Sequence, residues 1–402
     1  MKLNLTTFDL ILIFITLEEW PFINHQIYIV IKYLIIIYLL IRYSGDFLKI
    51  IIKEKKIGFA ALGLVLFTIL STISTVRYTN KLTWGLSALM NGMNYLAIFS
   101  SVYSIFEKRG SMQILKIIYL ILLIILVIND FLMFALTYNF DNPSEQYLVG
   151  NKFSISYYHC FLLVISKAYS IVCNSKNKRI IKKMPYFLGV FSILVCAIVH
   201  CSTGIIISTI SFGIILVPTT IKKIFCNKIW VIILLVVENI VIFGSTQLLV
   251  HPAVQSFIVN VLGKSSNFTG RFKIFAVLNG VIAKRPLLGY GFNTVTDIIT
   301  SICGYGNAQN GIKQLLIQFG VIGTTLLFLA LFIFAGKSKN NTEISLELYI
   351  MLFALSIAAA VEISISTLFV FVVSLIGGLQ LVTYQNRRKI KNERRYFYYK
   401  NI

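Results

Sequence analysis

The sequence predicts an all-α, polytopic integral membrane protein, and three observations carry that prediction. Of its 402 residues, 57% are hydrophobic and only 13% are charged, whereas soluble domains average about 45–50% and about 25%. The mean hydropathy is +0.82. The basic residues fall in short clusters between long apolar runs, which is typical of loops at a membrane surface. We therefore expect a single multi-span membrane domain over 1–402.

About twelve apolar segments are long enough, or nearly so, to cross a bilayer, which takes about 20 helical residues. The first, seventh and eighth of them are short. We expect these spans near 5–19, 25–42, 57–75, 84–106, 113–137, 153–173, 185–201, 203–218, 229–250, 311–335, 344–361 and 364–384.

The distribution of charge predicts the orientation of these spans. With a cytoplasmic N-terminus, 26 of the 37 Lys and Arg residues fall on the cytoplasmic side, and nine fall outside. This asymmetry follows the positive-inside rule. Both termini are therefore expected in the cytoplasm, with 385–402 as a basic tail that anchors in lipid. The net charge of +22 does not indicate nucleic-acid binding, because that needs a basic face on a soluble domain.

Other chemistries leave no signature in the sequence. The six cysteines are scattered and have neither metal-ligand nor redox spacing. No phosphate-binding loop, dinucleotide-binding glycine pattern or zinc-protease motif occurs. No Asp-x-Asp element is present to hold a metal-bound nucleotide sugar. We therefore expect no metal and no cofactor.

One long loop on the predicted outer side, 251–310, is the candidate functional region, because function on such proteins concentrates in long loops. Residues 270–284 have apolar side chains at three- and four-residue intervals, which predicts an amphipathic helix. Pro286 cannot continue that helix.

Two arginines flank the predicted helix. Arg271 and Arg285 are 14 residues apart, which at about 100° per residue returns them to nearly the same face. Such a pair has two interpretations. The arginines touch lipid phosphates at the membrane surface, or they form a site for a phosphorylated ligand, which the planar guanidinium suits.

The loop and its surroundings resemble the O-antigen ligase/polymerase superfamily, which includes Wzy-like repeat-unit polymerases. The resemblance rests on "TGRFKIF…KRPLLGYG" (269–291) and "AQNGIKQLLIQFGVIG" (308–323). Weaker likenesses are "GNKFSISYYH" (150–159), "CSTGIIISTISFGIIL" (201–216) and Glu362. It covers roughly 150–380 and implies a GT-C-like membrane fold.

The resemblance also implies an activity: metal-independent transfer of glycan from an undecaprenyl-pyrophosphate carrier to an acceptor at the outer face of the bacterial plasma membrane. Twelve residues are candidates for these roles. The catalytic candidates are Arg271 and Arg285, with Glu362 or Asp297 as the base; the substrate-binding candidates are Gln309, Asn310, Gly289, Tyr290, Gly291, Lys152, His159 and Arg77. The turn Gly289–Gly291 is expected to let backbone approach the diphosphate.

One departure from the family favours a particular branch. Ligase-type members have a His-Asn pair where this chain has Gln309-Asn310. A histidine can act as a base near neutral pH and an amide cannot. The difference favours a polymerase of capsular, exopolysaccharide or O-antigen repeat units, with a flippase and a chain-length regulator as expected partners. The alternatives are a ligase that uses another acceptor and a lipid-linked oligosaccharide flippase, although the internal repeats common in transporters are not seen.

Overall fold

The computed structural model is a bundle of helices. It describes residues 5–136, 138–140, 142, 145–173, 178–248, 256, 271–304, 306–336 and 342–400, and the side chains of 178, 241–248, 271–273, 276 and 386–400 lie outside that description. Within the described residues every regular element is helical. The helices are α1 (Leu5–Leu17), α2 (His25–Lys53), α3 (Lys55–Thr79), α4 (Leu82–Arg109), α5 (Ser111–Ala135), α6 (Lys152–Val172), α7 (Lys178–Ile198), α8 (Ser202–Leu216), α9 (Thr219–Phe225), α10 (Lys228–Leu248), α12 (Arg271–Lys284), α13 (Val295–Cys303), α14 (Gly311–Phe334), α15 (Glu343–Ala359) and α16 (Thr367–Lys400).

The helices match the apolar segments of the sequence. Each of the twelve expected spans coincides with one helix, and seven helices in the described part are long and apolar enough to cross a membrane. The chain is thus an all-helical, polytopic membrane protein. Helix α1 ends at Leu17, two residues earlier than expected, so Glu18 and Glu19 belong to the following loop.

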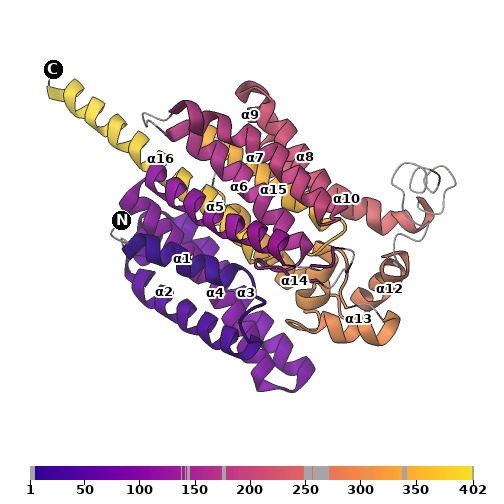
Figure 1. Cartoon of the computed structure of the whole chain (residues 1–402). Helices are drawn as coiled ribbons and strands as arrows, with labels where there is room; N and C mark the ends of the chain where they lie inside the picture. Colours follow the sequence, from indigo (N-terminus) through magenta and orange to yellow (C-terminus); the bar gives the residue numbers. More distant parts are fainter. Residues whose placement is uncertain are drawn as a thin grey trace.

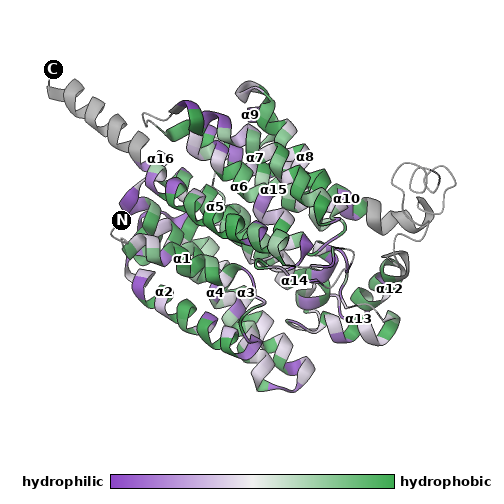
Figure 2. Ribbon diagram, in the orientation of Figure 1, coloured by the Kyte–Doolittle hydropathy of each residue, from purple (hydrophilic) through white to green (hydrophobic). Residues whose placement is uncertain are grey.

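Consecutive long helices run in opposite directions, so their ends form two sets (Figure 1). We call the end that carries α12 and α13 the loop end. The opposite end, where α2 and α14 finish, is called the tail end. Figure 2 shows hydrophobic residues along the helices of the bundle. Many of them face outward, as Ile41 and Ile52 do with 74% and 77% of their surface exposed, which is expected of a lipid-facing surface.

Aromatic packing holds the tail end of the bundle together. The rings of Phe99 on α4 and Phe334 on α14 stack with centroids 3.8 Å apart, and Tyr103 donates a hydrogen bond to the Phe334 carbonyl at 2.5 Å. Gly377 on α16 lies against this group, because a Cβ there would be 1.9 Å from the Tyr103 hydroxyl. Close packing at small residues is how membrane helices associate.

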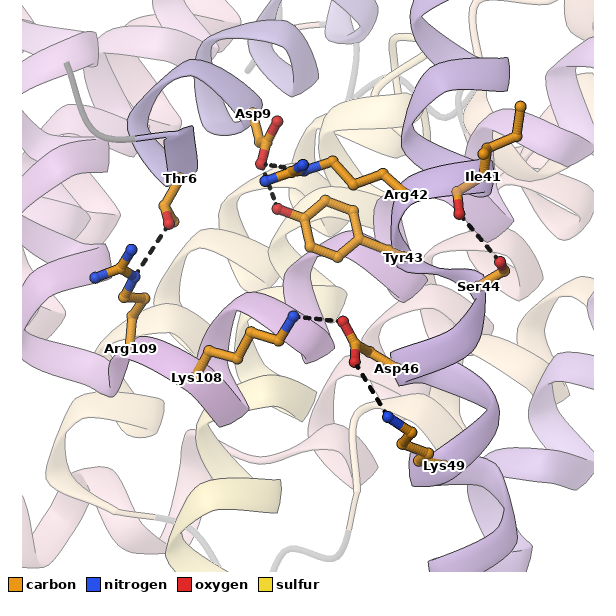
Figure 3. A network of polar contacts seen from close by, with 10 residues as sticks. All are labelled: Thr6, Asp9, Ile41, Arg42, Tyr43, Ser44, Asp46, Lys49, Lys108 and Arg109. Atoms are coloured by element: carbon orange, nitrogen blue, oxygen red, sulfur yellow. Dashed lines mark hydrogen bonds and ion pairs between the residues drawn. The ribbon is translucent and has the colours of Figure 1, made fainter.

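A polar network fixes α1 and α2 near the tail end (Figure 3). Asp9, which is fully buried, accepts a hydrogen bond from Arg42 Nε at 2.9 Å and others from Tyr38 and Tyr43. The buried carboxylate is therefore paired and hydrogen-bonded, as an ionised group in a membrane helix must be.

Candidate functional site

A cavity of about 680 Å³ lies at the loop end of the bundle. Its wall comes from the loop after α1, the start of α6, the α7–α8 turn, α12, the loop before α14 and the α15–α16 turn. The polar residues that matter most among those lining it are Glu18, Lys152, His200, Ser202, Gln309 and Glu362. Three of them, Lys152, Gln309 and Glu362, are residues that the sequence predicted for the site. We call this space the loop-end cavity.

The segment Gly150–Lys152 shapes one wall through its backbone. Gly150 has φ +102°, which favours glycine, and it pairs with Tyr147 through two backbone hydrogen bonds. Asn151 then caps α6, since its side chain accepts from the N–H groups of Phe153 and Ser154. Lys152 is the first residue of the helix and lines the cavity. The turn and the cap together place Lys152 at the cavity wall.

The α7–α8 turn forms a second wall. His200 has φ +50°, in the left-handed region that non-glycine residues seldom adopt. Cys201 caps α8 by accepting from the Gly204 N–H at 3.3 Å. A Cβ on Gly204 would lie 2.2 Å from the Ser156 hydroxyl, so α8 and α6 approach closely here. This packing brings His200 and Ser202 to the same cavity as Lys152.

The α15–α16 turn and the start of α14 form a third wall. Glu362 is 6% exposed and lines the cavity. Gln309 lines it too and has φ +49°. Asn310 is fully buried instead: its side chain accepts from the Lys313 N–H at 2.8 Å and donates to the Ala360 carbonyl at 3.1 Å. Asn310 thus caps α14 and ties it to the Glu362 turn. Of the two predicted substrate-binding candidates, Gln309 lines the cavity and Asn310 does not.

Helix α12 covers one side of the cavity. The predicted helix over 270–284 is confirmed as Arg271–Lys284, and it buries Ile274, Phe275, Leu278 and Val281. Ile274 lines the cavity. Arg271 opens the helix one turn earlier, and its side chain is outside the described part.

The segment Pro286–Gly291 inserts into a break in α14. Gly320 interrupts that helix with φ +62° and ψ −173°. Four backbone hydrogen bonds of 2.8–3.1 Å join the segment to the broken helix: Val321 to Pro286, Ile322 to Leu287, Tyr290 to Ile317 and Gly291 to Gln318. Backbone groups freed by a broken membrane helix need such partners. We call this arrangement the glycine clamp.

The clamp gives a different reason for its glycines from the one that the sequence suggested. A Cβ on Gly289 would lie 2.6 Å from the Gln318 carbonyl oxygen, and one on Gly320 would lie 2.2 Å from the Leu287 oxygen. Gly291 is equally close to Thr75 of α3, with 2.5 Å between a Cβ and the Thr75 Cα. The close approach seen here is to the protein's own backbone, and the expected approach of Gly289–Gly291 to a diphosphate stays a prediction.

Arg285 lies outside α12 and outside the cavity lining. The helix ends at Lys284, so the periodicity that put Arg271 and Arg285 on one face does not reach Arg285. Its guanidinium lies over the rings of Tyr78 and Tyr290, 4.7 and 5.4 Å from their centroids, and its side chain is exposed. Arg77, next to Tyr78, is also exposed.

Two further predicted residues lie apart from the cavity lining. Asp297 is exposed in the first turn of α13, so Glu362 is the better placed of the two base candidates. His159 is 1% exposed, and its Nε2 lies 3.1 Å from Asp130 Oδ1. Asn129, beside Asp130, accepts from the Val149 N–H at 3.3 Å. His159 therefore supports the turn that carries Lys152 and does not line the cavity with it.

Three of the six polar cavity residues named above, Glu18, His200 and Ser202, were not among the predicted site residues. Glu18 ends the first apolar run, where an acidic residue is unremarkable, and nothing in its local sequence indicates that it lines the same cavity as Glu362. Burial raises the pKa of the Glu18 carboxyl to about 7, with Lys32 lowering it and Glu19 raising it further. His200 lies at the end of an apolar run in the sequence, and only the structure shows its positive φ and its place in the cavity wall.

Comparison with models of known protein families finds no match to the chain, and a search of curated proteins also finds none. The class of protein is thus given by the fold: an all-helical, polytopic membrane protein with a polar cavity at the loop end.

Proposed function

We propose that the chain is a polymerase of glycan repeat units, which transfers glycan from an undecaprenyl-pyrophosphate carrier to a lipid-linked acceptor. One observation supports this most: Lys152, Gln309 and Glu362, predicted from separate stretches of sequence, line a single cavity, and the helix that Arg271 opens contributes Ile274 to the same lining. The proposal includes a GT-C-like bundle in which all twelve long segments cross the bacterial plasma membrane, with the loop end outside and both termini in the cytoplasm.

The cavity offers the groups that such a transfer needs. The acceptor hydroxyl oxygen attacks the anomeric carbon of the donor sugar, and the bond from that carbon to the pyrophosphate oxygen breaks. The bonding electrons leave with the lipid pyrophosphate. Lys152 and Arg271 would stabilise the growing negative charge, because preorganised donors do so without rearrangement.

The acceptor proton needs a base. We assign it to Glu18, a cavity carboxylate whose surroundings suit proton transfer near neutral pH. Glu362 and Gln309 would hold the acceptor hydroxyls by hydrogen bonds. Two carboxylates in one cavity with different surroundings can divide such roles.

A deletion strain tests this function. Cells that lack the protein should still make and flip single lipid-linked repeat units but lose long chains, and the wild-type gene should restore them. Gel analysis of surface glycan measures chain length, and analysis of extracted lipid identifies the accumulated unit. Normal-length glycan in the deletion strain would refute the proposal. Units trapped on the cytoplasmic face would identify a flippase instead, and full-length free polymer lacking its usual acceptor would identify a ligase.

A further inference from the structure

A second cavity, of about 520 Å³, lies at the tail end of the bundle. It forms where α3 and α10 begin, where α14 ends and beside the middle of α16. It has no lining residue in common with the loop-end cavity. We call it the tail-end cavity.

The charge in the tail-end cavity is mainly positive. Lys55, Lys56 and Lys228 line it with a single carboxylate, Glu54. Helices α3 and α10 both start here, and the positive ends of their dipoles add to the field of the ammonium groups. The cavity therefore attracts an anion.

Lys228 is fixed in place by backbone. Its ammonium donates to the carbonyls of Phe332 at 3.2 Å and Gly336 at 2.6 Å, at the end of α14. These two bonds leave its third N–H for a ligand. Lys55 and Lys56 are exposed, and neither has an ion-pair partner among the described residues. One lysine is thus positioned rigidly, and two flexible lysines stand at the mouth.

The surroundings of the tail-end cavity are apolar. Ile333, which lines it, is 37% exposed, and Phe59, one turn into α3, is 68% exposed. Tyr384, also in the lining, is 40% exposed, and tyrosine favours the membrane–water boundary. Cations beside lipid-facing side chains match a phosphate with acyl chains attached better than a free phosphate ion.

We propose that the tail-end cavity binds the headgroup of an anionic phospholipid. Its phosphate meets the ammonium groups of Lys55, Lys56 and Lys228, and its acyl chains run along Phe59 and Ile333. Basic pockets between membrane helices bind anionic headgroups in this way. Past Tyr384 the chain of α16 continues into Arg387, Arg388 and Lys389, which places further positive charge next along the sequence.

Native mass spectrometry of the purified full-length protein tests the site. The protein is presented with mixed micelles of phosphatidylglycerol and phosphatidylcholine, and the bound phospholipid is counted. The wild type should retain phosphatidylglycerol selectively. The double variant Lys55→Gln, Lys56→Gln should bind it about tenfold more weakly, since each cation near a membrane surface contributes substantially to anionic-lipid binding. Lys55→Arg, Lys56→Arg should keep the selectivity.

The matched control is Lys182→Gln, Lys183→Gln, a consecutive exposed pair in α7 that is outside the cavity lining. This control should bind like wild type, and the melting temperature of every variant shows that it is folded. Equal retention of phosphatidylglycerol by the two Gln pairs would overturn the proposal. Displacement of the lipid by inorganic phosphate at the same concentration would also overturn it, because it would identify a site for a free anion.

Discussion

The two cavities at opposite ends of the bundle are of similar size but differ in how they hold charge. The loop-end cavity combines Glu18 and Glu362 with Lys152, and the tail-end cavity has three lysines and one carboxylate. Turns and helix caps position the polar groups of the loop-end cavity. Asn151, for example, caps α6 beside Lys152. The second relies largely on long flexible side chains at helix starts. Fixed groups of both signs suit catalysis, whereas mobile cations of one sign suit binding of an anion.

Substitution of Glu18 is the strongest test of the difference between the two cavities. If it accepts the acceptor proton, Glu18→Gln should lower the transfer rate by about 10²-fold or more, the contribution of a general base. The wild-type rate should rise with pH through about 7, because a base acts in its deprotonated form and burial raises the Glu18 pKa to about 7. The variant's rate should not follow that rise. Purified protein in liposomes, supplied with lipid-linked units extracted from the deletion strain, permits the measurement.

Two variants control the assignment to Glu18. Lys32 lowers the pKa of Glu18, so Lys32→Met should move the midpoint of the rate to higher pH. Glu19→Gln removes an exposed neighbour that raises the pKa of Glu18, and it should move the midpoint the other way. A Glu18→Gln rate that keeps the wild-type pH dependence would transfer the role of base to another group in the cavity.

The arginines give the next largest expected effect. Arg271→Ala should reduce polymer by about 10²-fold, the scale for losing one preorganised donor, and Arg271→Lys should restore it only in part. Arg285→Ala should cost clearly less, since Arg285 stacks on Tyr78 and Tyr290 away from the cavity lining. Polymer yield in the complemented deletion strain, divided by protein level, measures both.

Lys284→Ala is the matched control, because this exposed cation ends the helix that Arg271 begins. It should leave polymer length unchanged. Equal losses of polymer from Arg271→Ala and Arg285→Ala would support the paired-arginine site expected from the sequence. Full polymer from the double variant would mean that both arginines contact only lipid.

Much of the fold could be predicted from sequence, because hydropathy reports directly on helices that lie in lipid. Lys152, Gln309 and Glu362 were named from the family resemblance, and the structure brings them to one cavity, while their roles stay predictions. Glu18 could not be predicted, since only tertiary packing brings the end of α1 to the turn after α15. Arg285 lies one residue beyond the last residue of α12, and the face that it was predicted to share with Arg271 stays a prediction, because the Arg271 side chain is outside the described residues.

The glycines of the clamp show a different limit of sequence reasoning. Gly289 and Gly291 signal a close backbone approach, and that much was predicted. The sequence does not say what approaches. The partner is the break at Gly320, which hydropathy places in the middle of an uninterrupted apolar segment.

The clamp offers the last test, because it joins the loop to the bundle, and we expect it to support the loop-end cavity more than the tail-end cavity. Gly320→Ala puts a Cβ 2.2 Å from the Leu287 oxygen, at a φ of +62° and a ψ of −173° that are almost confined to glycine. We expect the melting temperature of the purified protein to fall by about 5 °C or more. Gly280→Ala is the control, since nothing lies within 4 Å of its Cβ on α12, and it should change the melting temperature by about 1 °C or less.

In the Gly320→Ala protein that remains folded, transfer should fall while selective binding of phosphatidylglycerol persists. Loss of both together would show that the two cavities are not independent, and an unchanged melting temperature would show that the segment Pro286–Gly291 does not hold the break in α14.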